Sequence, residues 1–191
     1  NLTSGGLTGP HLDHGVTSDH RLVIQDTPIP AGALHMADLG FFDLTTLARI
    51  SSAQGFWLTR LQASTTVCTS DGVKRDLLAW LAAEAEPTTV VDQPVRLGTR
   101  QQLPARLLAV RVPPHVVEQR RRRLHAEAKR RGRTASAHQL AWAAWTILVT
   151  NVPVERLTLP EALVLLRTRW QIELLFKLWK SHGQVDTWRS G

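Results

Sequence analysis

The sequence predicts an α/β domain, and three observations lead to this class. A strand, a helix and a second strand are expected in succession within residues 33–61. Residues 62–112 contain several β-prone segments separated by Gly and Pro. Two long helical patterns follow, one beginning near residue 114 and the other near residue 158.

Clear start and stop residues bound the strand–helix–strand unit. The segment AGALHMAD predicts a short strand that ends at Asp38, and LGFFD is a tight connection after it. Asp43 is a typical N-cap for a helix that continues through Ile50. Gly55 precedes FWLTRL, which predicts the second strand. Asp38 therefore stands at the carboxyl end of a strand, where α/β folds gather their functional side chains.

The rest of the chain is expected to divide around this unit. STTVC, TTVVDQPVRLG and LPARLLAVRV predict strands, and KRDLLAWLAAEA predicts a helix in which Trp80 packs against the core. Ser136 is a predicted cap for a short helix, WTILVTNV a buried strand, and Thr158 the cap of the last helix. The expected parts are an incomplete N-terminal core portion (1–61), a β-rich insertion (62–112), a basic helix with linker (113–135) and a return to the core (136–191).

Composition and charge narrow the functional classes. The 191 residues are 43% hydrophobic and 20% charged, which is typical of a packed domain. No run approaches the roughly 20 apolar residues of a membrane span, and no signal-peptide pattern opens the chain, so an intracellular protein is expected. Lys and Arg number 23 against 16 Asp and Glu, a net charge of +7 that favours nucleic acid as partner. The single cysteine, Cys68, fits a small buried apolar side chain.

The last helix carries the most specific pattern. Arg169 is followed at helical spacing by Glu173, Lys177 and Lys180. At about 100° per residue, all three lie within about 80° of Arg169 and form one polar stripe. The other positions of 165–179 are mostly apolar, so this helix is expected to be buried. Spacing alone leaves two interpretations open: ordinary ion pairs four residues apart, or a metal-binding carboxylate beside phosphate-binding side chains.

The segment LRTRWQIELLFKLWKS resembles the Y-x2-R-x3-E-x6-K motif of DDE transposases of the insertion-sequence-four type. Arg169, Glu173 and Lys180 stand at the Arg, Glu and Lys positions of that motif. Leu166 replaces the Tyr, and Lys177 fits a second basic position between Glu and Lys. The segment TILVTNVP upstream is also similar to the family, and the resemblance extends across nearly the whole chain.

The resemblance implies an RNase-H-like mixed sheet flanked by helices, with a mostly β insertion before the Glu-bearing helix. Family members carry their second Asp at a strand end before a D-x-G-[YF] stretch, which Asp-Leu-Gly-Phe at Asp38 matches. Asp38 and Glu173 are then the catalytic ligands of two divalent ions, Mg²⁺ or alternatively Mn²⁺, for DNA cleavage and strand transfer. Arg169, Lys177 and Lys180 would contact DNA. Taken alone, Asp38 is more typical of a turn cap.

The first Asp that the resemblance requires is not found. The first 40 residues predict β structure around HLDHGV and a short helix from Asp19 to Ile24. Asp13, Asp19 and Asp26 are the earlier Asp residues, and none has the D-[ST]-T setting of the family. We therefore expect a truncated chain that lacks metal-dependent nicking activity. Robust Mg²⁺-dependent DNA cleavage by the purified chain, abolished in Asp38→Asn, would contradict this expectation.

A dense basic run begins with Arg120, Arg121, Arg122 and Arg123. A solvated helix face and contact with the DNA backbone are both open interpretations of such a run. The partners implied by the resemblance are double-stranded DNA, at transposon ends and target, and a second copy of the protein on DNA, in the nucleoid of a bacterial cytoplasm. Two rival hypotheses remain: an inactive remnant that binds DNA or dimerises and so inhibits transposition, and a general RNase-H-like nuclease.

Overall fold

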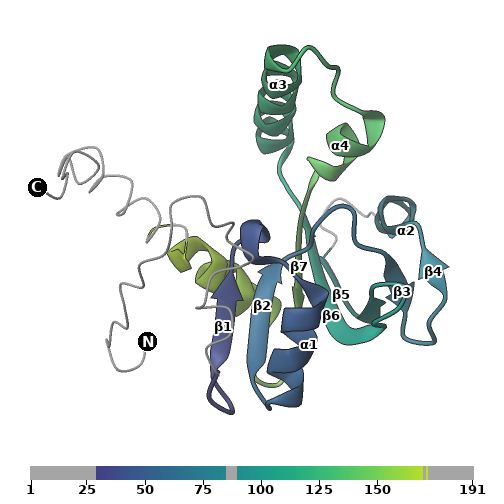
Figure 1. Cartoon of the computed structure of the whole chain (residues 1–191). Helices are drawn as coiled ribbons and strands as arrows, with labels where there is room; N and C mark the ends of the chain where they lie inside the picture. The colour runs from purple at the N-terminus through teal and green to yellow at the C-terminus, as the bar shows by residue number, and fades with distance from the viewer. Residues whose placement is uncertain (1–28, 85–89, 170, 172–191) are drawn as a thin grey trace, which may run out of the picture.

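The computed structural model describes residues 29–84, 90–169 and 171, which form one mixed seven-stranded sheet with helices around it (Figure 1). The strand order is β1-β2-β7-β6-β5-β3-β4, and a helix over residues 159–169 follows the last strand. The predicted α/β class is confirmed, and the mixed sheet is consistent with an RNase-H-like fold. In chain order the labelled elements are β1 (Leu34–Ala37), η3 (Leu39–Phe41), α1 (Leu44–Ser52), β2 (Phe56–Arg60), β3 (Val67–Thr69), β4 (Lys74–Arg75), α2 (Leu77–Ala83), β5 (Val90–Leu97), β6 (Leu103–Arg111), α3 (Pro114–Arg130), α4 (Ala137–Trp142) and β7 (Trp145–Thr150).

The predicted strand–helix–strand unit is present as β1, α1 and β2, with the two strands parallel and adjacent. Asp43 caps α1 as expected, because its carboxylate accepts a hydrogen bond from the Thr46 amide at 2.7 Å. Gly55 is required where α1 turns into β2. Its amide donates to the Ile50 carbonyl at 2.9 Å, and a Cβ at this position would lie 2.9 Å from Cγ2 of Ile50.

The strands predicted within residues 62–112 also form, and they extend the same sheet. β7 pairs antiparallel with β2 on one side and with β6 on the other, so it joins the parallel unit to the β5–β6 hairpin. β3 and β4 complete the far edge. As predicted, α2 forms around Trp80, which packs partly buried against the core, and Cys68 is buried. The β-rich region is therefore continuous with the rest of the sheet.

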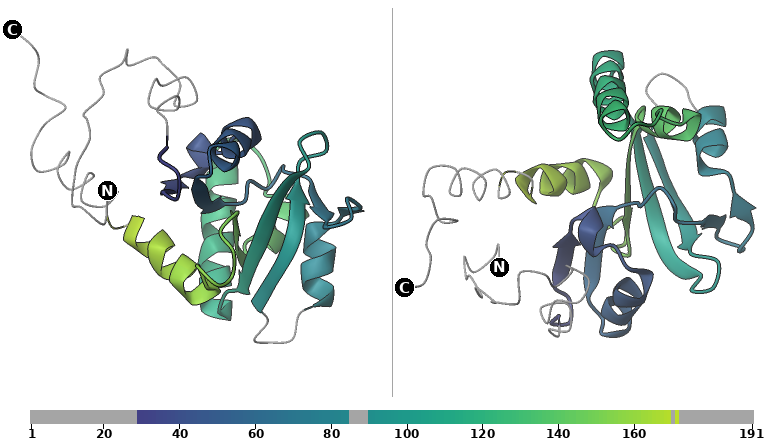
Figure 2. Two further views of the ribbon diagram at one scale, coloured as in Figure 1. Left: turned by 90° about the horizontal axis from the view of Figure 1, so that it is seen from below. Right: turned by 45° about the horizontal axis from the view of Figure 1, so that its top comes forward.

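Helices α3 and α4 leave the sheet between β6 and β7 and project beyond the strand ends (Figures 1 and 2). The basic helix predicted from residue 114 is α3, and Gly132 follows its end with a φ of 63°. Ser136 caps α4 as predicted, in a reciprocal capping box with Gln139. None of the residues of α3 is fully buried, so this helix is held by a narrow contact.

Apolar side chains pack on both faces of the sheet, because successive residues of a strand point to opposite sides. Trp57 faces the larger cluster, which includes residues of α1 and α2, whereas Leu58 faces a second cluster. That second cluster receives Leu159 and Ala162 from the helix at residues 159–169. The last helix is therefore packed against the face of the sheet opposite α1.

Thr158 is the N-cap of the last helix, as predicted. The Ala162 amide donates to the Thr158 carbonyl at 3.0 Å, and the Glu161 carboxylate accepts from the amide and hydroxyl of Thr158 at 2.8 and 2.7 Å. These hydrogen bonds lower the pKa of Glu161. The predicted hairpin and the helix from Asp19 to Ile24 lie outside the described residues. Within the described ranges, no helix combines the length and apolar character needed to cross a bilayer.

Candidate functional site

Asp38 lies where the sequence placed it, directly after β1 and at the start of η3. Its side chain is 49% exposed, and its carbonyl accepts from the Phe41 amide at 2.9 Å. The carboxylate makes no capping hydrogen bond to η3, so capping of the turn does not occupy its oxygens. Because Ala37 pairs with Thr59 in the parallel register, Asp38 emerges beside the carboxyl end of β2. This is the edge at which α/β sheets place their ligand-binding groups.

Arg169 reaches Asp38 from the last helix. Its Nη2 lies 3.5 Å from Oδ1 of Asp38, across 131 positions of sequence. The Arg169 side chain is only 16% exposed, whereas the carboxylate is open to solvent. The fold thus brings together two of the residues singled out from the sequence, one from a strand end and one from the motif-bearing helix.

Glu173, Lys177 and Lys180 lie outside the described residues, so their positions are not part of this geometry. Within residues 29–84 and 90–169, no three side chains of His, Cys, Asp or Glu gather as a metal site. Asp38 supplies one hard, accessible oxygen donor of the kind that Mg²⁺ takes, and any further ligands must come from elsewhere.

A partly buried arginine fixes the loop from which the last helix starts. Arg106 on β6 makes a bidentate pair with Asp92 on β5, at 2.9 and 2.7 Å. Its remaining nitrogen donates to the carbonyls of Val152 and Leu157 at 2.7 and 3.0 Å. The Arg106 side chain is only 13% exposed, so these charge-assisted bonds are largely shielded from water. This clamp was not found from the sequence, although a lone Arg inside the apolar run LPARLLAV is an available signal.

Asn151 and Thr150 attach the same loop to β2. The Asn151 side-chain oxygen accepts from the Trp57 amide at 2.8 Å, and its nitrogen donates to the Gly55 carbonyl at 3.0 Å. The fully buried Thr150 hydroxyl donates to the Trp57 carbonyl at 2.6 Å and accepts from the Val152 amide at 3.1 Å. The last helix is therefore positioned relative to Asp38 by satisfied polar contacts at its entry, in addition to apolar packing.

The four arginines predicted to contact DNA occupy different environments on α3. Arg120 donates to the Trp145 carbonyl at 2.8 Å and to the Thr146 hydroxyl at 3.0 Å, so it attaches α3 to β7. Arg121 donates to the Leu140 carbonyl at 3.0 Å, and Arg122 pairs with Glu118 one turn earlier. Arg123 makes no side-chain hydrogen bond or ion pair within the described residues. The Arg120 guanidinium therefore uses several of its donors in hydrogen bonds that join α3 to β7.

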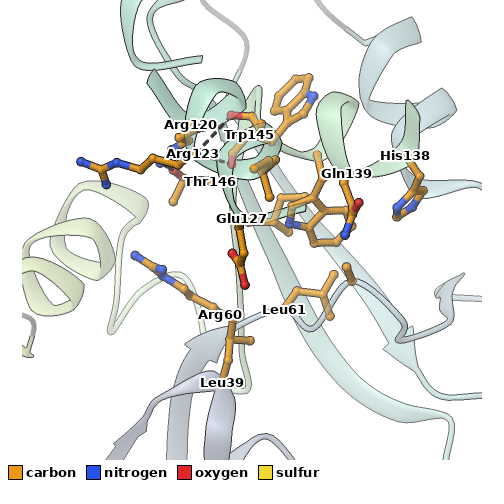
Figure 3. Close-up of a pocket in the computed structure, with 15 residues that line it drawn as sticks. Leu39, Arg60, Leu61, Arg120, Arg123, Glu127, His138, Gln139, Trp145 and Thr146 are labelled. Atoms are coloured by element: carbon orange, nitrogen blue, oxygen red, sulfur yellow. Dashed lines mark hydrogen bonds between the residues drawn. The ribbon is translucent and has the colours of Figure 1, made fainter. Parts of the chain in front are cut away.

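A cleft of about 540 Å³ lies beneath α3 and α4, beside the site edge of the sheet. Leu39, which follows Asp38, forms part of its lining, and Arg60 at the end of β2 forms another part (Figure 3). Arg123 lines it from α3. Arg60 was missed by the sequence interpretation, although a cation at the end of the apolar segment FWLTRL marks a strand end. The cleft is completed by Leu61, Ala63, Arg120, Leu124, Glu127, His138, Gln139, Trp142, Ala143, Trp145, Thr146 and Ile147.

The mixed α/β sheet has an accessible carboxylate at the end of a parallel strand and a cation from the last helix beside it, an arrangement consistent with an RNase-H-like fold. The family model of the transposase DDE domain matches residues 2–190. The chain therefore belongs to the transposase DDE domain family.

Curated relatives are transposases of bacterial insertion sequences. The transposase for insertion sequence element IS231F of Bacillus thuringiensis subsp. israelensis is 27% identical over 175 residues, 83% of this chain and 37% of the relative. The transposase for IS421 of Escherichia coli is 31% identical over 127 residues, 64% of this chain and 34% of the relative. The transposase for IS1151 of Clostridium perfringens is 24% identical over 172 residues, 80% of this chain and 36% of the relative. The chain thus spans little more than a third of the length of these relatives.

Proposed function

We propose that this chain is catalytic-domain sequence of an insertion-sequence transposase, which cleaves DNA strands and transfers them during transposition. The observation that carries the proposal is the approach of Arg169 to Asp38, because it joins the motif-bearing helix to the strand-end carboxylate. Family membership over residues 2–190 and the transposase relatives support it. The net charge of +7 supports double-stranded DNA as the partner. We also propose that the protein acts as a dimer on DNA.

Each site residue has a proposed role. Asp38 and Glu173 are the metal ligands, and Mg²⁺ is the proposed ion because carboxylate oxygens are its preferred donors. Divalent ions held there would stabilise the attacking and leaving oxygens of displacement at phosphorus. Arg169 orients the Asp38 carboxylate through the contact at 3.5 Å. Lys177 and Lys180, on the same helical stripe, bind phosphates of the DNA.

The division of the chain remains part of the proposal. Residues 1–61 and 136–191 would form the catalytic core, and residues 62–112 the β-rich insertion, with the basic helix and linker at 113–135 between them. The shared sheet supports a rigid connection between insertion and core, since β7 pairs with strands of both parts. Such a connection would hold DNA bound by the insertion in a fixed relation to Asp38.

The test is excision of a marked insertion sequence in bacterial cells, with the protein expressed from its complete reading frame. Asp38→Asn and Glu173→Gln should each abolish excision, because a neutral amide is a poor ligand for Mg²⁺. Asp71→Asn is the matched control: this exposed aspartate lies between β3 and β4, at the opposite edge of the sheet. Normal excision by Glu173→Gln at an unchanged protein level would overturn the assignment of the ligand.

A further inference from the structure

The cleft beneath α3 and α4 brings two cations from distant parts of the sequence to one opening. Arg60 ends β2, which is the neighbour of β1 at the edge where Asp38 emerges. Arg123 belongs to α3, which covers the cleft from the other side. In Figure 3 both guanidinium groups extend toward the same side of the cleft. The two arginines therefore line one cleft, and Leu39, which follows Asp38 in the chain, lines it as well.

The Arg60 and Arg123 side chains differ from the other cations nearby, since neither makes a hydrogen bond or ion pair within the described residues. Both residues are exposed. Arg120, by contrast, donates to a main-chain carbonyl and a hydroxyl of β7. Burial, and after it the charge of Arg60, lowers the pKa of Arg120, so Arg60 lies within electrostatic reach of Arg120. The cleft therefore has two cationic groups available for an anion.

The interior of the cleft is less polar than its rim. Trp145 is buried and Trp142 is partly buried, and both line the cleft together with Leu61. A volume of about 540 Å³ lies within the range of small-ligand sites, roughly 300–1,000 Å³. Such a space admits a short length of one nucleic-acid strand, with its phosphates at the rim, and is too small for a whole duplex.

We propose that Arg60 and Arg123 bind backbone phosphates of a single DNA strand that leaves the Asp38 site and enters this cleft. The inference rests on the proposed function, because it assumes that DNA is the substrate at Asp38. Arg60 was not among the residues predicted from the sequence to bind DNA. Within the basic run, the proposal assigns DNA binding to Arg123 and not to Arg120. Glu127 lines the same cleft and opposes the strand through its negative charge.

The experiment measures the affinity of the chain for a fluorescent single-stranded dT oligonucleotide at several salt concentrations. Arg60→Gln and Arg123→Gln should each lower affinity about tenfold, the equivalent of one charge-assisted hydrogen bond. Each should also reduce the slope of log affinity against log salt by roughly 0.7, the value for one lost phosphate contact on a single strand. Arg75→Gln is the matched control, because Arg75 is an exposed arginine on β4 at the opposite sheet edge.

A gain of affinity tests the same cleft without the risk of unfolding. Glu127→Gln should raise affinity for the oligonucleotide about two- to fivefold, the size of a screened charge interaction at a surface. Glu118→Gln is its control, since both glutamates lie on α3 and pair with an arginine four residues later, whereas of the two only Glu127 lines the cleft. An equal gain in the two variants would assign the effect to net charge and overturn the proposal.

The outcomes separate the two claims. If the unchanged chain binds neither the oligonucleotide nor a duplex of the same length, the proposed function fails. If the unchanged chain binds DNA, and Arg60→Gln and Arg123→Gln behave like Arg75→Gln, the cleft is not the path of the strand and only this inference fails. Loss of duplex affinity with unchanged single-strand affinity also overturns it, because it assigns both arginines to a duplex surface.

Discussion

Arg106 on β6 is nearly enclosed, and it bonds to Asp92 and to two main-chain carbonyls of the loop at residues 151–157. On the projecting helix α3, Arg122 is 77% exposed and pairs with Glu118, one turn away. The first arginine fixes the loop that leads into the last helix. The second belongs to a region that contacts the sheet narrowly and displays charge. The same residue type therefore fixes the backbone where it is enclosed and leaves its charge at the surface where it is exposed.

The largest effect is expected at the buried clamp. Arg106→Met should lower the free energy of unfolding by about 3 kcal/mol, because Asp92 loses its partner and two carbonyls lose a donor. Urea denaturation of the purified chain measures this change. Arg122→Met, on the exposed helix, provides the comparison. Equal changes in the two variants would mean that burial does not distinguish the two regions.

Arg120 should fall between these extremes. Arg120→Met removes the bonds to Trp145 and Thr146 that attach α3 to β7, and should lower the free energy of unfolding by about 1 kcal/mol. Arg123→Met, one turn further on the same helix, should change it by less than about 0.5 kcal/mol. Urea denaturation of both variants is the measurement. A larger loss of unfolding free energy in Arg123→Met would show that the Arg123 side chain stabilises the fold and is not available for a ligand.

A pH-dependent effect is expected at His35 on β1. Burial lowers the pKa of His35 below its ordinary value of 6.5, so the unfolded chain takes up the proton first as pH falls. The contribution of the neutral His35 ring to the free energy of unfolding is fully present above the ordinary pKa of 6.5. It is lost as the pH falls from there toward the lower pKa of the folded chain. Urea midpoints at about pH 7.5 and about pH 5.5 should differ less in His35→Gln than in the unchanged chain. If the two urea midpoints differed by as much in His35→Gln as in the unchanged chain, this role of His35 would be contradicted.

The smallest effect is expected for the exposed pair on α3. Glu118→Gln removes the partner of Arg122 and should change the free energy of unfolding by about 0.3–0.5 kcal/mol, the usual size for pairs four residues apart on a helix. The difference should disappear in high salt, because exposed charges are screened. Urea denaturation at low and high salt checks this. A salt-independent loss above about 1 kcal/mol would show that α3 is held more firmly than its exposure indicates.

Much of the fold follows from local signals that the structure confirms. Asp43, Ser136 and Thr158 were expected as helix caps, and each makes hydrogen bonds of that kind. The strands around Gly55 and in the β-rich region also form where β-prone segments stood between turn residues. These predictions succeed because capping and turn formation depend on a few neighbouring residues.

The candidate site was predicted less completely. Asp38 was predicted from a strand-end position together with the family resemblance, and the structure places it directly after β1. Arg169 was predicted from its helical spacing and the same resemblance, and the roles of both residues in the site stay predictions. Arg106 was not found, since the carbonyls that it binds lie 46 and 51 positions away in the sequence. Arg60 was not found, since separate elements form the cleft that it lines. Arg120 was grouped with its neighbours because a sequence run does not show which side of a helix faces the sheet.

By itself, the sequence determined the α/β class, the helix caps, the strand-end carboxylate and the motif that marks the family. Only the tertiary structure decided that the β-rich region shares one sheet with β1 and β2, that Arg169 reaches Asp38, and that Arg120 and Arg123 have different environments. The reason is physical. Local backbone geometry is set by adjacent residues, whereas burial and hydrogen-bond partners are set by which distant segments pack together.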